Sequence, residues 1–147
     1  MQDAPHKDLR RTRAANRSII PTSTGAAQAV GLVLPQLQGR LGGMATRVPV
    51  SGGSMTDFTA VIKKLSTKRE INQAMLAASQ DALKGILAYT EDPIVSIDVI
   101  GNPHSCIFDA QLTAVKGHMI RIVGWYDNEG GYAQRIVDLI RHLEMYQ

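Results

Sequence analysis

The residues best suited to bind an anion are hydroxyl side chains and a glycine just before a predicted helix. Thr24 and Gly25 follow two other hydroxyl residues and precede the small residues 26–30, which predict a helix that ends before Pro35. The free N–H groups and positive dipole of a helix start attract anions, and a glycine lets a phosphate approach closely. The segment therefore predicts a phosphate site, with an ordinary N-cap as the alternative.

Arg47 is a second candidate for anion binding, because it lies in an apolar segment that is predicted to be a strand. A guanidinium among apolar residues needs a carboxylate or a phosphate as its partner. The sequence leaves open whether Arg47 binds a phosphate or forms a buried structural ion pair.

The segment DNEGGY, residues 127–132, joins a predicted strand to the last predicted helix. It presents the amide of Asn128 and the ring of Tyr132 at the helix start, where amide groups could hold a planar ligand. An Asx-type cap and turn is the alternative, because Asp and Asn side chains bond to their own backbone at such positions. Both interpretations remain open.

Cys106 is the single cysteine and invites comparison with a catalytic nucleophile. His104 would share a strand face with it, and Asp109 is nearby in the sequence. Nothing places Cys106 at a helix N-terminus, where the pKa of a thiol falls, so we expect a small core residue. One cysteine and four histidines provide neither an internal disulfide nor a Cys/His cluster with metal-ligand spacing.

The composition is that of one soluble globular domain. The chain has 147 residues, of which 44% are hydrophobic and 20% charged. Its apolar runs are shorter than the roughly 18 residues of a membrane span, and the polar N-terminus lacks the apolar core of a signal peptide. We therefore expect a cytoplasmic protein with no membrane partner.

The net charge of +3 is concentrated in an N-terminal arm, residues 1–17. The arm has five basic and two acidic residues, a difference of +3, so the domain expected over residues 18–147 is neutral. Aromatic side chains for stacking bases are absent from the arm, which argues against nucleic acid as its partner. We expect it to be solvated or to meet anions or a partner subunit.

Periodicity and turn residues predict an alternation of helices and strands. A Ser-Gly-Gly turn between residues 44–50 and 54–64 suggests a hairpin, and Thr67 with Glu70 forms a capping box. Long hairpins with helices that can cover only one face predict an α+β fold, with a mixed, largely antiparallel sheet. The expected helices cover residues 26–34, 67–83 and 128 or 131 to the end, and the expected strands cover residues 44–50, 54–64, 94–100, 105–114 and 118–126.

Six segments are similar, in order and spacing, to motifs of one protein family. As a set they are highly specific and extend over essentially the whole chain, which resembles the C-terminal catalytic domain of phosphorylating glyceraldehyde-3-phosphate dehydrogenase. The segments are PHKDLRR (5–11), SIIPTSTGAA (18–27), RVP (47–49), LKGILAYTE (83–91), IFDA (107–110) and WYDNE (125–129).

The resemblance implies a role for each anion candidate. Thr24 and Gly25 would bind one phosphate position and Arg47 another, with Arg11 close to the anion site. The implied substrates are glyceraldehyde 3-phosphate and inorganic phosphate, and the implied products are 1,3-bisphosphoglycerate and NADH.

The resemblance also implies a cofactor and an assembly. Asn128 would hold the carboxamide of the nicotinamide, with Tyr132 nearby. NAD is the expected cofactor, since Ala4-Pro5 favours NAD weakly over NADP. NADP stays an open alternative. The family forms homotetramers in which the basic arm crosses to a neighbouring subunit. Gly130 stands at a position where members of the family usually have a bulky aromatic residue.

The nucleophilic cysteine, the base histidine and the glycine fingerprint of the family precede this region and are absent from the sequence. We therefore expect a fragment that is inactive alone and complete only with the N-terminal half. The alternatives are a non-catalytic assembly or binding module, and a fragment of erythrose-4-phosphate dehydrogenase.

Overall fold

The computed structural model describes residues 4–145. The chain divides into two compact units, a first unit that ends at Val50 and a second unit that begins at Ser51, and each is described by itself. The predicted division into an arm and a domain at residue 17 stays a prediction.

The first unit holds the arm, one helix and a two-stranded sheet. The strands are antiparallel, with Ile20 opposite Arg47 and Thr22 opposite Ala45. The helix ends before Pro35, as predicted, because proline cannot continue the hydrogen-bond ladder. The elements are η1 (Ala15–Arg17), β1 (Ile20–Thr22), α1 (Ala26–Val33), η2 (Pro35–Leu37) and β2 (Ala45–Arg47).

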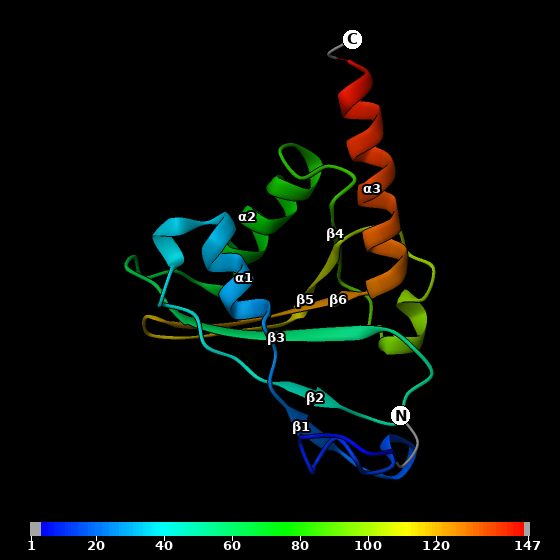
Figure 1. Cartoon of the computed structure of the whole chain (residues 1–147). Helices are drawn as coiled ribbons and strands as arrows, with labels where there is room; N and C mark the ends of the chain where they lie inside the picture. The colour runs from blue at the N-terminus through cyan, green and yellow to red at the C-terminus, as the bar shows by residue number, and fades with distance from the viewer. Residues whose placement is uncertain (1–3, 146–147) are drawn as a thin grey trace. The chain divides into compact units, whose positions relative to one another are not determined.

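The second unit is a four-stranded mixed sheet in the order β3-β6-β5-β4, with one parallel pair between β4 and β5. Figure 1 shows α2 and α3 on the same side of this sheet. The predicted α+β class, with a mixed, largely antiparallel sheet, is confirmed. The elements are β3 (Ser54–Val61), α2 (Lys68–Gln80), β4 (Leu87–Thr90), η3 (Ser96–Val99), β5 (Cys106–Lys116), β6 (Met119–Tyr126) and α3 (Asn128–Glu144).

The core of the second unit lies between α2 and the sheet. Leu87, Phe108 and Ala110 are buried there, and the rings of Tyr89 and Phe108 stack with centroids 5.8 Å apart. Partly buried side chains from α2 and the strands complete the cluster: Ile71, Met75, Ala78, Cys106 and Ile122.

The predicted hairpin between residues 44–50 and 54–64 is wrong. β2 pairs with β1, and β3 pairs instead with β6. β2 ends at Arg47, two residues before Pro49, which has no N–H to donate to a ladder. Gly53 has a φ of 74° and packs against the backbone of Ser96, so the chain that enters β3 lies against η3.

The predicted strand over residues 94–100 is also wrong, because this segment contains the short helix η3. The carboxylate of Asp98 accepts a hydrogen bond of 2.8 Å from the N–H of Val95, which stabilises a helical turn. The strand of this region is β4, which the sequence did not predict.

The capping box of α2 is confirmed. Oγ1 of Thr67 accepts from the N–H of Glu70 at 3.2 Å, and Oε2 of Glu70 accepts from the N–H of Thr67 at 2.7 Å. The helix ends at Gln80 instead of about Leu83, and a turn then leads to Gly85, whose φ is 78°.

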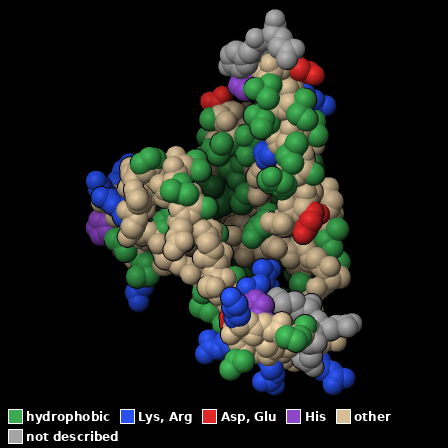
Figure 2. All heavy atoms as spheres, viewed as in Figure 1, with side chains coloured by type: hydrophobic (Ala, Val, Ile, Leu, Met, Phe, Trp, Pro, Cys, Tyr) green, Lys and Arg blue, Asp and Glu red, His purple; other side chains and the backbone are tan. Residues whose placement is uncertain are grey.

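Helix α3 begins at Asn128, the first of the two predicted starts, and carries apolar side chains that remain exposed along its length (Figure 2). None of the helices found between residues 4 and 145 has both the length and the apolar content of a membrane span. The exposed apolar residues of α3 are Tyr132, Ile136, Val137, Leu139, Ile140 and Leu143.

Candidate functional site

The start of α1 is open to an approaching ligand. Oγ1 of Thr24 accepts a hydrogen bond of 3.2 Å from the N–H of Ala26, and its own O–H is free to donate elsewhere. A Cβ built on Gly25 would meet no atom within 4 Å. The glycine therefore leaves space in front of the helix.

The first turn of α1 also offers backbone donors. The N–H of Ala29 bonds to the carbonyl of Gly25 at 2.9 Å and closes the first helical turn. Within residues 4–145, the N–H groups of Ala27 and Gln28 have no hydrogen-bond partner, as expected of a helix start. Thr24 thus acts as a partial cap, and two amides remain for an anion.

Arg47 is exposed at the end of β2 and makes no ion pair with any residue that the structure describes. The buried ion pair considered from the sequence is therefore absent from this part of the chain. Arg47 lies opposite Ile20 in the two-stranded sheet, and Ile20 precedes Thr24 by four residues. Four residues of extended chain span roughly 13 Å, so Arg47 and Thr24 would serve separate anion positions.

Arg11 is half-buried in the first unit, and its Nε has no hydrogen-bond partner among residues 4–145. A buried guanidinium nitrogen without an acceptor is unusual and favours a missing anionic partner. Thr24, Gly25, Arg47 and Arg11 all belong to the first unit.

The start of α3, in the second unit, is fixed by Asp127. Oδ1 of Asp127 accepts from the N–H groups of Glu129 and Gly130, both at 3.1 Å, and Oδ2 accepts from the N–H of Gly101 at 2.7 Å. These backbone donors, Gly101 first, lower the pKa of the Asp127 carboxyl. The sequence suggested the cap but not the bond to Gly101, which ties α3 to the loop after η3.

Asn128 follows this cap as the first residue of α3 and is exposed. Its side-chain amide has no hydrogen-bond partner among residues 4–145, so its oxygen can accept and its NH2 group can donate hydrogen bonds to a ligand. Tyr132 lies four residues further along the helix and is 70% exposed. Residues at this spacing lie on the same side of a helix.

Cys106 is half-buried at the start of β5, and burial raises the pKa of its thiol. Nδ1 of His104 is 2.9 Å from Oδ1 of Asn102, so the ring has a polar partner other than the cysteine. Within residues 4–145, His, Cys, Asp and Glu side chains form no cluster of three or more that could hold a metal ion.

Residues 1–128 match the family model described as "Glyceraldehyde 3-phosphate dehydrogenase, C-terminal domain". The chain is 58% identical over 139 residues to glyceraldehyde-3-phosphate dehydrogenase 1 of Streptomyces avermitilis. It is 56% identical over 140 residues to glyceraldehyde-3-phosphate dehydrogenase of Mycobacterium avium. These matches cover 95% of the chain but only 42% and 41% of the two relatives, so the chain spans about two-fifths of their length.

Proposed function

Because the chain belongs to the C-terminal domain family of glyceraldehyde-3-phosphate dehydrogenase, an oxidoreductase family of glycolysis, we propose that it supplies the phosphate-binding and nicotinamide-contacting residues of that enzyme. The reaction converts glyceraldehyde 3-phosphate, phosphate and NAD to 1,3-bisphosphoglycerate and NADH. The observation that carries the proposal is the open start of α1, where Thr24 and Gly25 leave two amides unpaired.

The chain's contribution to this reaction is to hold anions. The hydroxyl of Thr24 and the first-turn amides of α1 would bind one phosphate, and Arg47 with Arg11 would bind at the other position. Holding the substrate phosphate and inorganic phosphate in fixed positions orients them toward the reacting carbon. Such positioning lowers a barrier by several kcal/mol, up to about 7–11 in well-oriented cases.

The second contribution is to orient the cofactor. NAD supplies the hydride acceptor when it is bound. The unpartnered amide of Asn128 fits the nicotinamide carboxamide, because two amides can exchange a donor and an acceptor. Asp127 holds the helix start that carries Asn128, because its carboxylate accepts three hydrogen bonds from backbone N–H groups. A cytoplasmic homotetramer that uses NAD is part of the same proposal.

The anion sites can be tested on the chain itself. A ligand of the native state raises the thermal midpoint as its concentration increases. We expect phosphate to raise the midpoint above that in chloride at equal ionic strength, and Arg47→Gln to reduce this difference. Arg40→Gln, a matched loss of an exposed cation, is the control. An equal phosphate effect in all three proteins would contradict the role of Arg47.

The cofactor role needs the rest of the enzyme. The chain can replace the matching segment of the Streptomyces avermitilis relative, and NADH formation by the chimera can be followed. We expect Asn128→Ala to lower kcat/KM for NAD roughly tenfold or more, since it removes paired hydrogen bonds. Gln73→Ala, an exposed amide on α2, should leave it unchanged. Equal activity of the two variants would contradict the proposal.

A further inference from the structure

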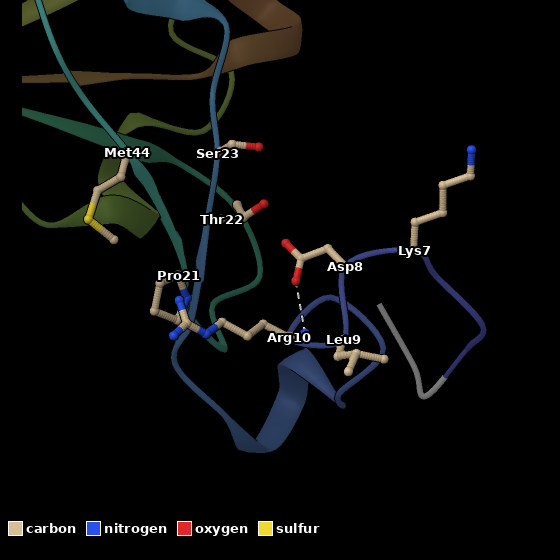
Figure 3. Close-up of a pocket in the computed structure, with 8 residues that line it drawn as sticks. All are labelled: Lys7, Asp8, Leu9, Arg10, Pro21, Thr22, Ser23 and Met44. Carbon is tan, nitrogen blue, oxygen red and sulfur yellow. Dashed lines mark hydrogen bonds between the residues drawn. The ribbon is translucent and has the colours of Figure 1, made fainter.

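A pocket of about 610 Å³ in the first unit is separate from the residues proposed above (Figure 3). The arm lines one side of it, and β1 with the residue that follows lines the other. Neither Thr24, Gly25, Arg47 nor Arg11 is among its lining residues. The lining consists of Lys7, Asp8, Leu9, Arg10, Pro21, Thr22, Ser23 and Met44.

One residue that lines the pocket has a buried polar atom that lacks a partner. Thr22 is only 6% exposed, and its Oγ1 has no hydrogen bond within residues 4–145. A buried hydroxyl without a partner destabilises a protein, so most such groups are satisfied by protein, water or ligand. In Figure 3 the hydroxyl of Thr22 points toward the side of the strand on which Asp8 lies.

The charges of the lining favour an anion. Lys7 and Arg10 are cationic, and Asp8 is the single acidic residue of the lining. Oδ1 of Asp8 accepts a hydrogen bond of 2.9 Å from the N–H of Arg10, so this carboxylate orders the arm's turn. Figure 3 shows Arg10 extending toward Pro21, whereas Lys7 extends away from the strand.

We propose that this pocket is a further anion site, which binds a phosphate group through Arg10 and the hydroxyls of Thr22 and Ser23, with Lys7 as a second cation of the lining. Two cations suit a dianion such as phosphate better than a monovalent carboxylate. The apolar side chains of Leu9 and Met44 could cover a short carbon skeleton attached to the phosphate. The proposal goes beyond the proposed function, because it uses different residues.

The test is a calorimetric titration of the full chain with inorganic phosphate and, in a second arm, with glycerol 3-phosphate. Tighter binding of the ester assigns the pocket to an organic phosphate, and equal binding assigns it to the free ion. We expect Arg10→Gln to weaken binding at this site about tenfold. Arg17→Gln removes the same charge from an exposed arm position outside the pocket and should have little effect.

Asp8→Asn gives the opposite expectation. The asparagine keeps an oxygen for the N–H of Arg10 but removes the negative charge that repels the ligand. Binding should therefore tighten roughly two- to fivefold. Asp3→Asn is the control, because it removes the same charge elsewhere in the arm. If both variants tighten phosphate binding equally, the effect is one of the arm's overall charge, and the proposal is overturned.

Thr22→Val tests the hydroxyl without changing charge or shape. It removes an unsatisfied polar group, so the thermal midpoint without phosphate should stay or rise. The rise in midpoint that phosphate produces should fall. An unchanged phosphate effect would show that Thr22 has only a structural role and would remove the hydroxyl from the site.

The two anion proposals fail in different ways. If Arg47→Gln weakens phosphate binding and Arg10→Gln leaves it unchanged, the pocket is not a site and the proposed function stands. If only Arg10→Gln weakens binding, the pocket stands and the assignment of Arg47 falls. Two independent losses, one in each variant, would support both.

Discussion

The indole Nε1 of Trp125 donates a hydrogen bond of 3.0 Å to Oδ2 of Asp109 in the neighbouring strand. Asp109 is 2% exposed, and its Oδ1 accepts from the backbone N–H groups of Gln111 and Leu112. The pairing of β5 with β6 shifts its register directly after Asp109. One carboxylate therefore satisfies the backbone of this irregular segment and ties it to β6.

We predict that Asp109→Ala destabilises the chain by about 3 kcal/mol, because three donors around this buried carboxylate lose their acceptor in a partly buried position. Asp109→Asn should cost about 1–2 kcal/mol, since its amide keeps an oxygen for the backbone but turns an NH2 group toward the indole N–H. Urea unfolding measures both. The exposed Asp92→Asn is the control, and equal midpoints for Asp92→Asn and Asp109→Asn would contradict the role of Asp109.

Asp127 predicts a pH dependence of stability. Its pKa lies below the ordinary 3.8 in the folded chain, because the N–H groups of Gly101 and Gly130 bond to the carboxylate. The folded state therefore binds this proton less readily than the unfolded state does. The stabilisation is present above the unfolded pKa and is lost as the pH falls through the folded pKa.

We expect Asp127→Asn to lower the thermal midpoint at neutral pH, and the difference from the parent chain to shrink as the pH falls below 3.8. Thermal unfolding over this pH range is the measurement. Asp81→Asn, in an exposed position, should show no such convergence. A constant difference at all pH values would mean that the carboxylate charge at position 127 does not contribute.

Gly53 predicts a steric effect at the connection into β3. Its φ is 74°, and a Cβ there would overlap the carbonyl of Ser96. Gly53→Ala should destabilise the chain by about 3 kcal/mol or more, since backbone would have to move. Gly117→Ala is a matched control with a φ of 60° and no atom within 4 Å, so it should cost only about 1–2 kcal/mol. Equal losses of stability in the two variants would show that the positive φ alone, and not the contact with Ser96, requires glycine at position 53.

Local signals predicted the elements that local interactions determine. The capping box of Thr67 and Glu70 opens α2, and the Asp127 cap opens α3. Tertiary interactions decided the rest. β4 is a short strand held by parallel pairing with β5, and the partners of β2 and β3 depend on distant segments.

The candidate site shows the same division. Thr24 and Asn128 stood out because helix starts have a recognisable sequence. The Asp127 bond to Gly101 joins residues 26 positions apart, and no local pattern reveals it. The pocket likewise depends on the arm lying beside Thr22, a long-range contact. The exposure of Arg47 also depends on tertiary structure, since an apolar neighbourhood in sequence does not require burial.

The chemistry of Cys106 predicts that the chain alone forms no NADH from glyceraldehyde 3-phosphate. Burial raises the pKa of its thiol, so the reactive thiolate is scarce at neutral pH. The ring of His104 pairs with Asn102. Absorbance of NADH in the presence of substrate, phosphate and NAD is the measurement. Turnover that disappears in Cys106→Ser would contradict both the core role of the cysteine and the expected inactivity.

The apolar face of α3 predicts self-association of the chain. Leu139, Ile140 and Leu143 are each more than half exposed, and apolar patches of this kind are usually covered in stable proteins. We expect an oligomer or aggregate in sedimentation, and greater solubility when the chain is co-expressed with the unmatched part of the Streptomyces avermitilis relative.

The salt dependence of self-association distinguishes an apolar interface from one made by the basic arm. Association through α3 should hold or tighten at high salt, whereas pairing of the arm's arginines with carboxylates or phosphate should weaken. Leu139→Gln with Leu143→Gln should shift the chain toward monomer, because polar side chains reduce the gain from burying that face. Arg141→Gln, on the same helix, should not. A soluble monomer at both salt concentrations, before any substitution, would refute the idea that α3 requires a covering partner.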